Sequence, residues 1–528
     1  MASKVTLVLF LTLLSSSIAA QNVSYGDINW WCNQTPYADD CKYFMKSHVS
    51  ESFKPKDKSQ FLKLAVQVAL DQTLLCQNHT VSLGPPDGGG GGGGSQEGVK
   101  TAWATCLDLY ESTVRQLNST INPNGKITGF DAQTWLSTAL TNLETCRAGF
   151  AEIDLKNDTL PIRWNNVSNL ISNTLAINKA PTTEDNGSSN HEFPGWVSEV
   201  DRKLLQSRRL ATARAKFVVA KDGSGNFRTI QDGLNMAIRS RRGNRRIVIY
   251  VKGGVYWENI EIDATMTNIM LVGDGMRKTI ISGSRSVGGS TTTFTSATFG
   301  AMGEGFIARG ITFRNTAGPQ SQAVALRSGS DHSAYYRCSF EGYQDTLYVH
   351  SQRQFYKECY IYGTIDFIFG NAAVVFQNCI IYVRKPIYGQ ANVITAQGRI
   401  DPNQNTGISI YKSTVMAAPD LRPVLRYYKT FLGRPWKQYS QTVYLETYLD
   451  KLIDPKGWTT WGGNFALNTL YYGEYKNYGP ASSTTRRVRW RGYHVITNPR
   501  EAARFTVSNF IAGRSWLPST GVPYKDGL

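Results

Sequence analysis

The chain has 528 residues, of which 41% are hydrophobic, and a formal net charge of +17. This length is too great for one ordinary hydrophobic core and indicates two domains. The charge divides the chain in the same way, because residues 1–200 carry −5 and residues 216–528 carry +18. A region as basic as the second suits an anionic polymer as its partner.

The first 20 residues have the layout of a cleaved signal peptide. Lys4 precedes an apolar stretch from Val5 to Leu14, and small residues lead up to Ala20. This stretch is too short to span a bilayer, and no later stretch reaches the roughly 18 apolar residues that a span requires. We therefore expect a secreted protein without membrane association once the signal is removed, which argues against nucleic acid as its partner.

Residues 21–180 are expected to form a bundle of helices. Apolar residues recur near the helical period of 3.6 in residues 61–75, 101–117 and 134–150, and a glycine-rich connector lies at 85–95. A polar linker, residues 181–215, follows, and its basic pairs favour proteolysis. Sequons for N-glycosylation occur only in this first part of the chain, at Asn22, Asn33, Asn78, Asn118, Asn157, Asn166 and Asn186.

From residue 216 onward, short β-rich segments replace the helical pattern. Cys338, Cys359 and Cys379 recur at spacings of 21 and 20 residues, each flanked by apolar residues. A repeat of about 20 residues with short strands predicts a solenoid of parallel strands rather than a doubly wound sheet. The expected architecture is an all-α bundle followed by an all-β parallel β-helix.

Two carboxylates share the period of this repeat. Asp345 in GYQDTLYV and Asp366 in GTIDFIFG are 21 residues apart, so they should lie on adjacent coils with backbones about 4.8 Å apart. Two such carboxylates cannot both ionise cheaply, and the pair can supply an acid and a base. Gln344 and Gln322, about one coil earlier, offer neutral amide donors to an oxyanion. Arg434, in FLGRPW, could fix a carboxylate in place.

Other catalytic arrangements have little support in the sequence. No G-x-S-x-G segment occurs, and His332, His350 and His494 have no recognisable triad setting. Clusters of Cys and His are absent, so neither a metal nor a cofactor is expected. The spacing alone leaves one alternative open, namely that each aspartate only caps a turn.

Several segments of residues 216–528 resemble, in order, the signature segments of plant pectin methylesterases. They are GGVYWE (253–258), SQAVALRSGSD (321–331), GYQDTLYVH (342–350), GTIDFIFGNAAVVFQNC (363–379) and LGRPW (432–436), extended by KDGSGNFRTIQ (221–231) and ALNTLYYGEYKNYGP (466–480). The resemblance implies a right-handed parallel β-helix that hydrolyses the methyl esters of pectin (homogalacturonan) to pectate and methanol.

The resemblance also assigns a role to each candidate catalytic residue. Asp366 would attack the ester carbonyl as the nucleophile, and Arg434 would hold its carboxylate. Asp345 would protonate the departing methanol and then activate water as a base. Gln322 and Gln344 would form the anion hole.

Aromatic residues in or near the same segments are expected to hold the sugar ring. They are Tyr348, Phe369, Trp436 and Trp458. The basic charge of this domain would keep the enzyme attracted to the carboxylates that it creates.

The N-terminal region is similar to the pectin methylesterase inhibitor family, a secreted four-helix bundle. That family's two bridges imply the pairs Cys32–Cys41 and Cys106–Cys146 and leave Cys76 over. In enzymes with such a pro-region, a basic-Leu-Leu site is processed, and the linker residues Arg202, Lys203, Leu204 and Leu205 resemble this site. The bundle is then expected to silence the enzyme, or to assist its folding, until the linker is cut.

The chain departs from the pectin methylesterase pattern at Ser413. The family usually carries a Cys there that pairs with the position of Cys379. Cys379 is therefore expected to lack its bridge, which leaves Cys338 and Cys359 as neighbours and candidates for a disulfide.

The expected partners follow from these resemblances. They are pectin, inhibitor proteins and a processing protease, encountered by a monomer in the cell wall or apoplast. A pectate lyase or a polygalacturonase is the rival reading, because β-helices also carry those activities. A purely inhibitory protein with an inert β-helix is the other, and the complete set of five candidate catalytic residues argues against it.

Overall fold

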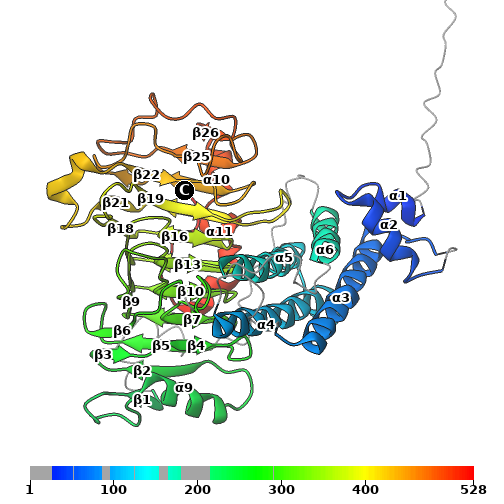
Figure 1. The fold of residues 1–528 in the computed structure, drawn as a ribbon, viewed down its shortest axis with the longest axis horizontal. Helices are drawn as coiled ribbons and strands as arrows, with labels where there is room; N and C mark the ends of the chain where they lie inside the picture. Colours follow the sequence, from blue (N-terminus) through cyan, green and yellow to red (C-terminus); the bar gives the residue numbers. More distant parts are fainter. Residues whose placement is uncertain are drawn as a thin grey trace, which may run out of the picture.

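The computed structural model describes residues 27–50, 53–85, 95–123, 125–153, 164–179, 215–288 and 290–528. Within these residues a helical unit packs against one side of a long stack of strands (Figure 1). The signal peptide at 1–20, most of the glycine-rich connector and the site at Arg202–Leu205 lie outside the described residues, as do Asn22, Asn157 and Asn186. Of the other sequon asparagines, Asn33, Asn78 and Asn118 are exposed and Asn166 is half-buried.

The helical unit is the predicted bundle. Its helices are α1 (Ile28–Cys32), α2 (Ala38–Lys46), α3 (Lys58–Leu83), α4 (Gln96–Ile121), α5 (Gly129–Glu152) and α6 (Trp164–Asn178). The long helices begin at capping side chains: Asp57 accepts from Gln60 N, and Thr128 forms a capping box with Asp131.

Disulfides and apolar packing hold the bundle together. The disulfides Cys32–Cys41 and Cys106–Cys146, which the resemblance implied, are both present. The second ties α4 to α5 within the apolar core of the bundle. Cys76 packs half-buried against this core.

The C-terminal region is a parallel β-helix made of three sheets, and from β2 to β24 each consecutive strand passes to the next sheet. The first sheet contains β1 (Phe217–Val219), β2 (Ile247–Val251), β5 (Ile269–Gly273), β8 (Ile307–Arg309), β11 (Ser333–Tyr336), β14 (Arg353–Lys357), β17 (Ala373–Gln377), β20 (Gly407–Tyr411), β23 (Gln441–Leu445), β25 (Tyr471–Tyr475) and β26 (Tyr493–Val495). The second contains β3 (Gly254–Trp257), β6 (Thr279–Gly283), β9 (Thr312–Asn315), β12 (Ser339–Glu341), β15 (Tyr360–Gly363), β18 (Ile380–Val383), β21 (Thr414–Ala417) and β24 (Tyr448–Leu449). The third contains β4 (Ile260–Ile262), β7 (Phe299–Ala301), β10 (Leu326–Ser328), β13 (Leu347–Val349), β16 (Ile368–Gly370), β19 (Asn392–Gln397) and β22 (Thr430–Gly433). This architecture confirms the predicted β-helix.

Short helices complete this domain. They are α9 (Ile230–Arg239), which packs on β1 and β2, η2 (Arg422–Tyr427), α10 (Pro499–Ala503), α11 (Val507–Phe510), α12 (Gly513–Trp516) and η3 (Leu517–Thr520). The C-terminal segment covers the outer face of the first sheet and forms a second apolar cluster with it.

The three cysteines of the repeat stack at one corner of the coils. The register of β12, β15 and β18 places Cys338, Cys359 and Cys379 at equivalent positions, and each follows a residue with positive φ. Ser413 continues this stack: its hydroxyl accepts from Cys379 N at 3.1 Å.

The expected disulfide between Cys338 and Cys359 is wrong, because both are buried free thiols. In an in-register parallel stack, equivalent side chains run side by side instead of pointing at each other. The Cys359 thiol donates to the carbonyl oxygen of Tyr335 at 3.3 Å, and the Cys338 thiol lies 3.6 Å from that of Tyr336. A disulfide would require both sulfurs to turn away from these acceptors.

Candidate active site

Asp345 and Asp366 occupy equivalent turns immediately before β13 and β16. The register pairs Leu347 with Ile368 and Tyr348 with Phe369, so the two aspartates are neighbours on adjacent coils, as their spacing predicted. Both have positive φ, 62° and 50°, and both are buried, with 8% and 4% of their surface exposed. An aspartate tolerates this left-handed conformation better than most residues do.

A glycine precedes each aspartate by three residues, and close packing explains why. A Cβ on Gly363 would approach Phe367 Cβ to 2.2 Å, and a Cβ on Gly342 would approach Thr346 Oγ1 to 2.7 Å. The chain therefore doubles back tightly around each aspartate. This local geometry presents the two carboxylates on the same side of the coil stack.

Arg434, at the end of β22, binds Asp366 with two nitrogens. Its Nη2 donates to Asp366 Oδ2 at 2.6 Å, and its Nε donates to Oδ1 at 2.9 Å. The guanidinium also lies over the ring of Trp461, 4.4 Å from its centroid. Burial raises the pKa of Asp366, and the hydrogen bonds from Arg434 oppose this rise.

Asp345 lies in a different electrostatic environment. Burial raises the pKa of Asp345 well above its usual value, and the nearby carboxylates of Asp366 and Glu152 raise it further. Arg434 opposes the rise only at a distance, and no basic side chain of the described residues forms an ion pair with Asp345. The pair therefore favours a protonated Asp345 beside an ionised Asp366, as coupled carboxylates do when one has the better counter-ion.

Both predicted glutamines line the same cavity as the aspartates. This cavity has a volume of about 230 Å³ and contains Gln322, Gln344, Asp345, Asp366 and Arg434 in its lining. Gln344 directly precedes Asp345, and its carbonyl oxygen accepts from Ala323 N at 3.2 Å. This hydrogen bond and the register of the strands place Gln322 one coil before Tyr343, at the equivalent position. Gln322 therefore lies beside the two aspartates, but its position in the coil is not equivalent to theirs.

Aromatic rings form the floor of the cavity. Tyr348 and Phe369 stack with their centroids 4.3 Å apart, and Trp436 meets both edge-on. Phe294 and Trp461 also line the cavity, although the sequence reasoning did not select them. The second Trp of WTTW was the available signal for Trp461.

The structure does not bring Trp458 to the cavity. Its side chain is 1% exposed and belongs to the interior core, where it stacks on Tyr472 at 4.2 Å. An isolated β-bridge to Gly433 continues the third sheet at this point and directs the indole inward. The expectation that Trp458 binds substrate is therefore wrong.

The helical bundle closes the cavity from above. Thr145, Ala148, Gly149 and Glu152 of α5 are part of its lining. A carboxylate oxygen of Glu152 accepts from Thr293 N at 2.6 Å, and burial raises the pKa of Glu152. A carboxylic acid from the bundle thus lies in the same cavity as the two aspartates.

No group of three or more His, Cys, Asp or Glu among the described residues could hold a metal ion. None of the described helices is long and apolar enough to cross a membrane.

Comparisons with known proteins identify the family of each region. The profile of the Pectinesterase family matches residues 216–514, and that of the plant invertase/pectin methylesterase inhibitor family matches residues 26–177. Pectinesterase 2 of Citrus sinensis is 55% identical over 100% of both chains, and probable pectinesterase/pectinesterase inhibitor 17 of Arabidopsis thaliana is 54% identical over 99% of this chain and 98% of its own. A solved pectin methylesterase from carrot superimposes with a TM-score of 0.58 and 54% identity, over 59% of this chain and 98% of its own. The chain belongs to the pectinesterase family and carries an N-terminal domain of the pectin methylesterase inhibitor family.

Proposed function

We propose that this pectinesterase cleaves the methyl esters of pectin through a covalent intermediate on Asp366. The observation that carries the proposal is the asymmetry of the pair: Arg434 binds Asp366 with two nitrogens, whereas the pKa of Asp345 is raised well above its usual value by burial and by Asp366. An ionised carboxylate is the nucleophile that the first step needs, and a protonated neighbour is the acid.

The two aspartates and the two glutamines are sufficient for both chemical steps. An oxygen of Asp366 attacks the ester carbonyl, while the amides of Gln322 and Gln344 donate to the developing oxyanion. The tetrahedral intermediate collapses, Asp345 gives its proton to the methoxide, and methanol leaves. Water then attacks the acyl-enzyme and loses a proton to Asp345, which releases the galacturonate carboxyl and regenerates Asp366.

Methanol release from methylated pectin tests this mechanism. Asp366→Asn and Asp345→Asn should each lose most turnover, at least about a thousandfold, because each removes a group that the covalent route requires. Asn is nearly isosteric with Asp, so the thermal midpoint should change little. Retention of turnover by Asp366→Asn would exclude it as the nucleophile, and shortening of the polymer would favour a lyase or a polygalacturonase instead.

We further propose that the bundle is a pro-region that blocks the cleft in its own chain. Beyond Glu152 in the cavity, Glu144 of α5 binds Lys437 Nζ at 2.5 Å, next to Trp436. Burial would raise the pKa of Glu144, but Arg147 and Lys437 outweigh it and lower the pKa. The contact therefore keeps its charge while the bundle is docked.

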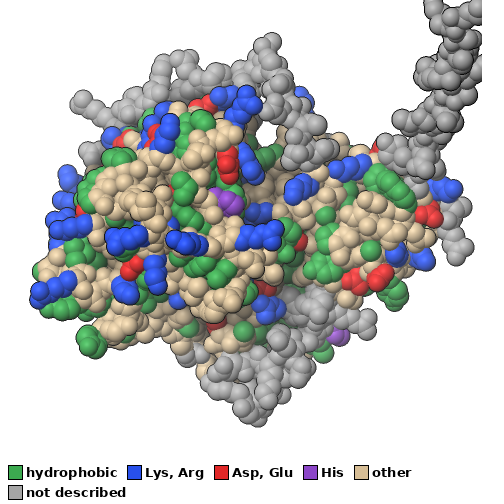
Figure 2. Space-filling model, turned by 90° about the horizontal axis from the view of Figure 1, so that it is seen from above, with side chains coloured by type: hydrophobic (Ala, Val, Ile, Leu, Met, Phe, Trp, Pro, Cys, Tyr) green, Lys and Arg blue, Asp and Glu red, His purple; other side chains and the backbone are tan. Residues whose placement is uncertain are grey.

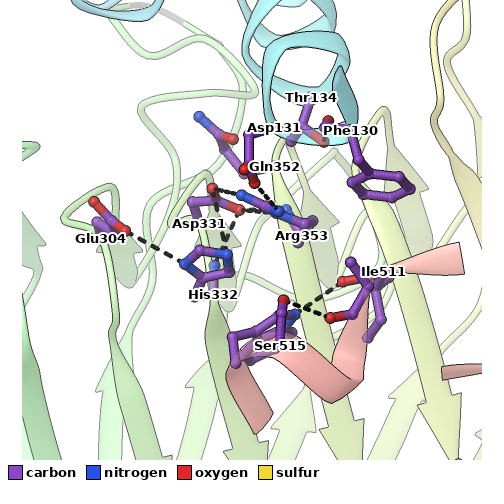
Figure 3. Close-up of polar contacts among 12 residues, drawn as sticks. Phe130, Asp131, Thr134, Glu304, Asp331, His332, Gln352, Arg353, Ile511 and Ser515 are labelled. Atoms are coloured by element: carbon purple, nitrogen blue, oxygen red, sulfur yellow. Dashed lines mark hydrogen bonds and ion pairs between the residues drawn. The ribbon is translucent and has the colours of Figure 1, made fainter. Parts of the chain in front are cut away.

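A second ion pair anchors the start of α5 away from the cavity (Figure 3). Asp131 accepts from Arg353 Nη1 at 2.6 Å, and Asp331 holds the same guanidinium through Nε and Nη2 at 2.9 and 2.6 Å. Gln352 donates to Gln116 of α4 at 2.9 Å beside it. The bundle is thus fixed at both ends of α5, with the catalytic cavity beneath its C-terminal end.

Cutting the linker tests the blocking role. A specific protease site placed within residues 181–214 allows the full chain to fold before it is cut. Methanol release should rise after cutting and separation of the bundle, and it should fall again when the bundle is added back. Equal activity before and after separation would discard the blocking role and leave a folding role for the bundle.

The remaining assignments concern domains and location. We propose a signal peptide at 1–20, an inhibitor-like bundle at 21–180, a linker at 181–215 with processing at Arg202–Leu205, and a catalytic domain at 216–528. The chain would be secreted to the cell wall, with the sequon asparagines as glycan sites. Lys and Arg side chains are spread over the β-helix face in Figure 2, which supports attraction to an anionic polymer. Mass spectrometry of the secreted protein tests the cleavage points and the glycans.

A further inference from the structure

The floor of the cleft continues beyond the catalytic pair as a ladder of outward-facing residues. Arg327 on β10 is directly beside Tyr348 on β13, which is beside Phe369 on β16, whereas Leu326 and Leu347 face the interior. Neighbouring strands are about 4.8 Å apart, which is close to the length of one sugar ring in an extended chain. Arg327 therefore lies about one sugar unit from the position of Tyr348 along the floor.

Arg327 is held rigidly and keeps a spare donor. Its guanidinium lies 3.5 Å from the centroid of the Phe294 ring, and it donates to the Phe294 carbonyl oxygen and to the carboxylate of Glu261. Its side chain is only 4% exposed, and its buried Nε has no hydrogen-bond partner in the structure. A buried N–H without a partner is costly, so a ligand that accepts from it gains that energy back.

Arg327 and Glu261 line a second cavity, of about 500 Å³, which adjoins the first. Phe294 lines both cavities, so the second cavity lies next to the first, on the side toward β4. Helix α4 forms the roof and contributes Asp108 and Glu111. In the full chain this second space is therefore covered by the bundle, as the first one is.

The bundle places an acidic group above Arg327. Burial and Glu111 raise the pKa of Asp108, while Arg115 and Arg327 oppose the rise. Asp108 of the bundle therefore lines the cavity of Arg327, as Glu152 of the bundle lines the cavity of Asp345. The bundle thus holds two carboxyl groups, those of Asp108 and Glu152, over the floor on which a polymer of uronic acids would lie.

We propose that Arg327 binds the free carboxylate of an already de-esterified galacturonate next to the unit whose ester is attacked, and that Glu261 limits this binding by sharing the guanidinium. A carboxylate accepts charge-assisted hydrogen bonds from a guanidinium, whereas a methyl ester offers only a neutral acceptor. The inference rests on the proposed function and adds a preference for esters beside existing product. In the full chain, Asp108 of the bundle lines the same cavity as Arg327.

Two defined oligogalacturonates test the proposal: one fully methyl-esterified, and one with a single free carboxylate. The enzyme is the full chain, folded, cut in the linker and separated from its bundle, and the readout is the ratio of kcat/KM for the two substrates from methanol release. The wild type should favour the acid-containing substrate by about tenfold, mainly through KM, as one charge-assisted hydrogen bond allows. Mass spectrometry of the first product should locate the cleaved ester beside the free carboxylate.

Two variants should shift this ratio in opposite directions. Arg327→Gln should bring it close to one, and Glu261→Gln should raise it above the wild-type value, because the guanidinium is then no longer shared. Arg337→Gln is the matched control, since Arg337 is exposed and pairs with Glu358 elsewhere on the coils, and its ratio should equal that of the wild type.

The possible outcomes separate this inference from the proposed function. A wild-type ratio of one, or an unchanged ratio in Arg327→Gln, overturns the role of Arg327 while methanol release still supports the esterase. If Arg327→Gln does not fold, Glu261→Gln decides, because an unchanged or lower ratio there contradicts the proposal. Failure of the wild type to release methanol from either substrate overturns the proposed function itself.

Discussion

Replacing Asp131 by Asn tests whether the ion pair in Figure 3 holds the bundle on the β-helix. The side chain of Arg353 is 1% exposed, and Asp131 contacts it at 2.6 Å. Burial would raise the pKa of Asp131, but Arg353 outweighs it and lowers the pKa, so the carboxylate stays charged in mild acid. The variant leaves Arg353 with its partner Asp331, so the cost should stay below the roughly 3–5 kcal/mol of orphaning a buried ion.

We expect a loss of about 1.5–3 kcal/mol of docking energy, the usual range for a hydrogen bond to a charged group. This corresponds to a dissociation constant roughly 10 to 150 times higher for the bundle, measured as its inhibition constant after the linker is cut. Asn retains one acceptor oxygen for Thr128, so α5 should still begin normally. Asp39→Asn, an exposed acidic residue of α2, is the control. An inhibition constant that does not change in Asp131→Asn would refute the anchoring role.

Three further predictions concern Glu152, Trp458 and Trp461. Burial in the docked state raises the pKa of Glu152 above its ordinary value of 4.5, so its contribution to docking is present below pH 4.5 and is lost as the pH rises through the docked pKa. Glu152→Gln should therefore flatten the pH dependence of bundle release above pH 4.5, and an unchanged profile would contradict this. Trp458→Ala should destabilise the β-helix by about 3–5 kcal/mol in denaturant unfolding, because it empties a buried site. Trp461→Ala should instead lower kcat/KM with little change in the unfolding midpoint, because the exposed ring of Trp461 lies over Arg434. A large loss of stability in Trp461→Ala would contradict the placement of Trp461 in the substrate site.

The repeat explains why the proximity of the two aspartates could be predicted from the sequence. In a parallel solenoid, one spacing fixes the register, and the 21 residues between Cys338 and Cys359 recur between Asp345 and Asp366. The same logic failed for the thiols, because equal register places equivalent side chains side by side without turning their sulfurs toward each other. Register therefore predicts proximity, but it does not predict bonding.

Residues in the long connections of the coils were harder to assign. Trp458 and Trp461 are three residues apart in WTTW, yet one continues a sheet through its bridge to Gly433 and the other stands in the loop beyond it. No periodicity marks where the sheet ends within this connection. Which indole reaches the cavity depends on that single bridge, and the bridge depends on tertiary packing.

The docking face of α5 could not be recognised as an interface from the sequence either. Ser137, Thr141 and Thr145 are spaced by four residues, so they form a polar stripe that would ordinarily face water. In the structure, Ser137 donates to Asn405 at 3.2 Å, Asn371 donates to Thr141 at 2.9 Å, and Thr145 meets His350 at 2.9 Å.

Water can replace each of these polar contacts when the bundle leaves. A hydrogen bond that is exchanged with water contributes little net free energy. A polar interface of this kind can therefore stay bound while the linker raises the local concentration of the bundle, and it binds more weakly once the linker is cut. An apolar stripe on α5 would have been visible in the sequence, but it would have left both partners with an exposed hydrophobic surface after separation. The polar face therefore suits the proposed pro-region, which would fold against the enzyme and detach from it once the linker is cut.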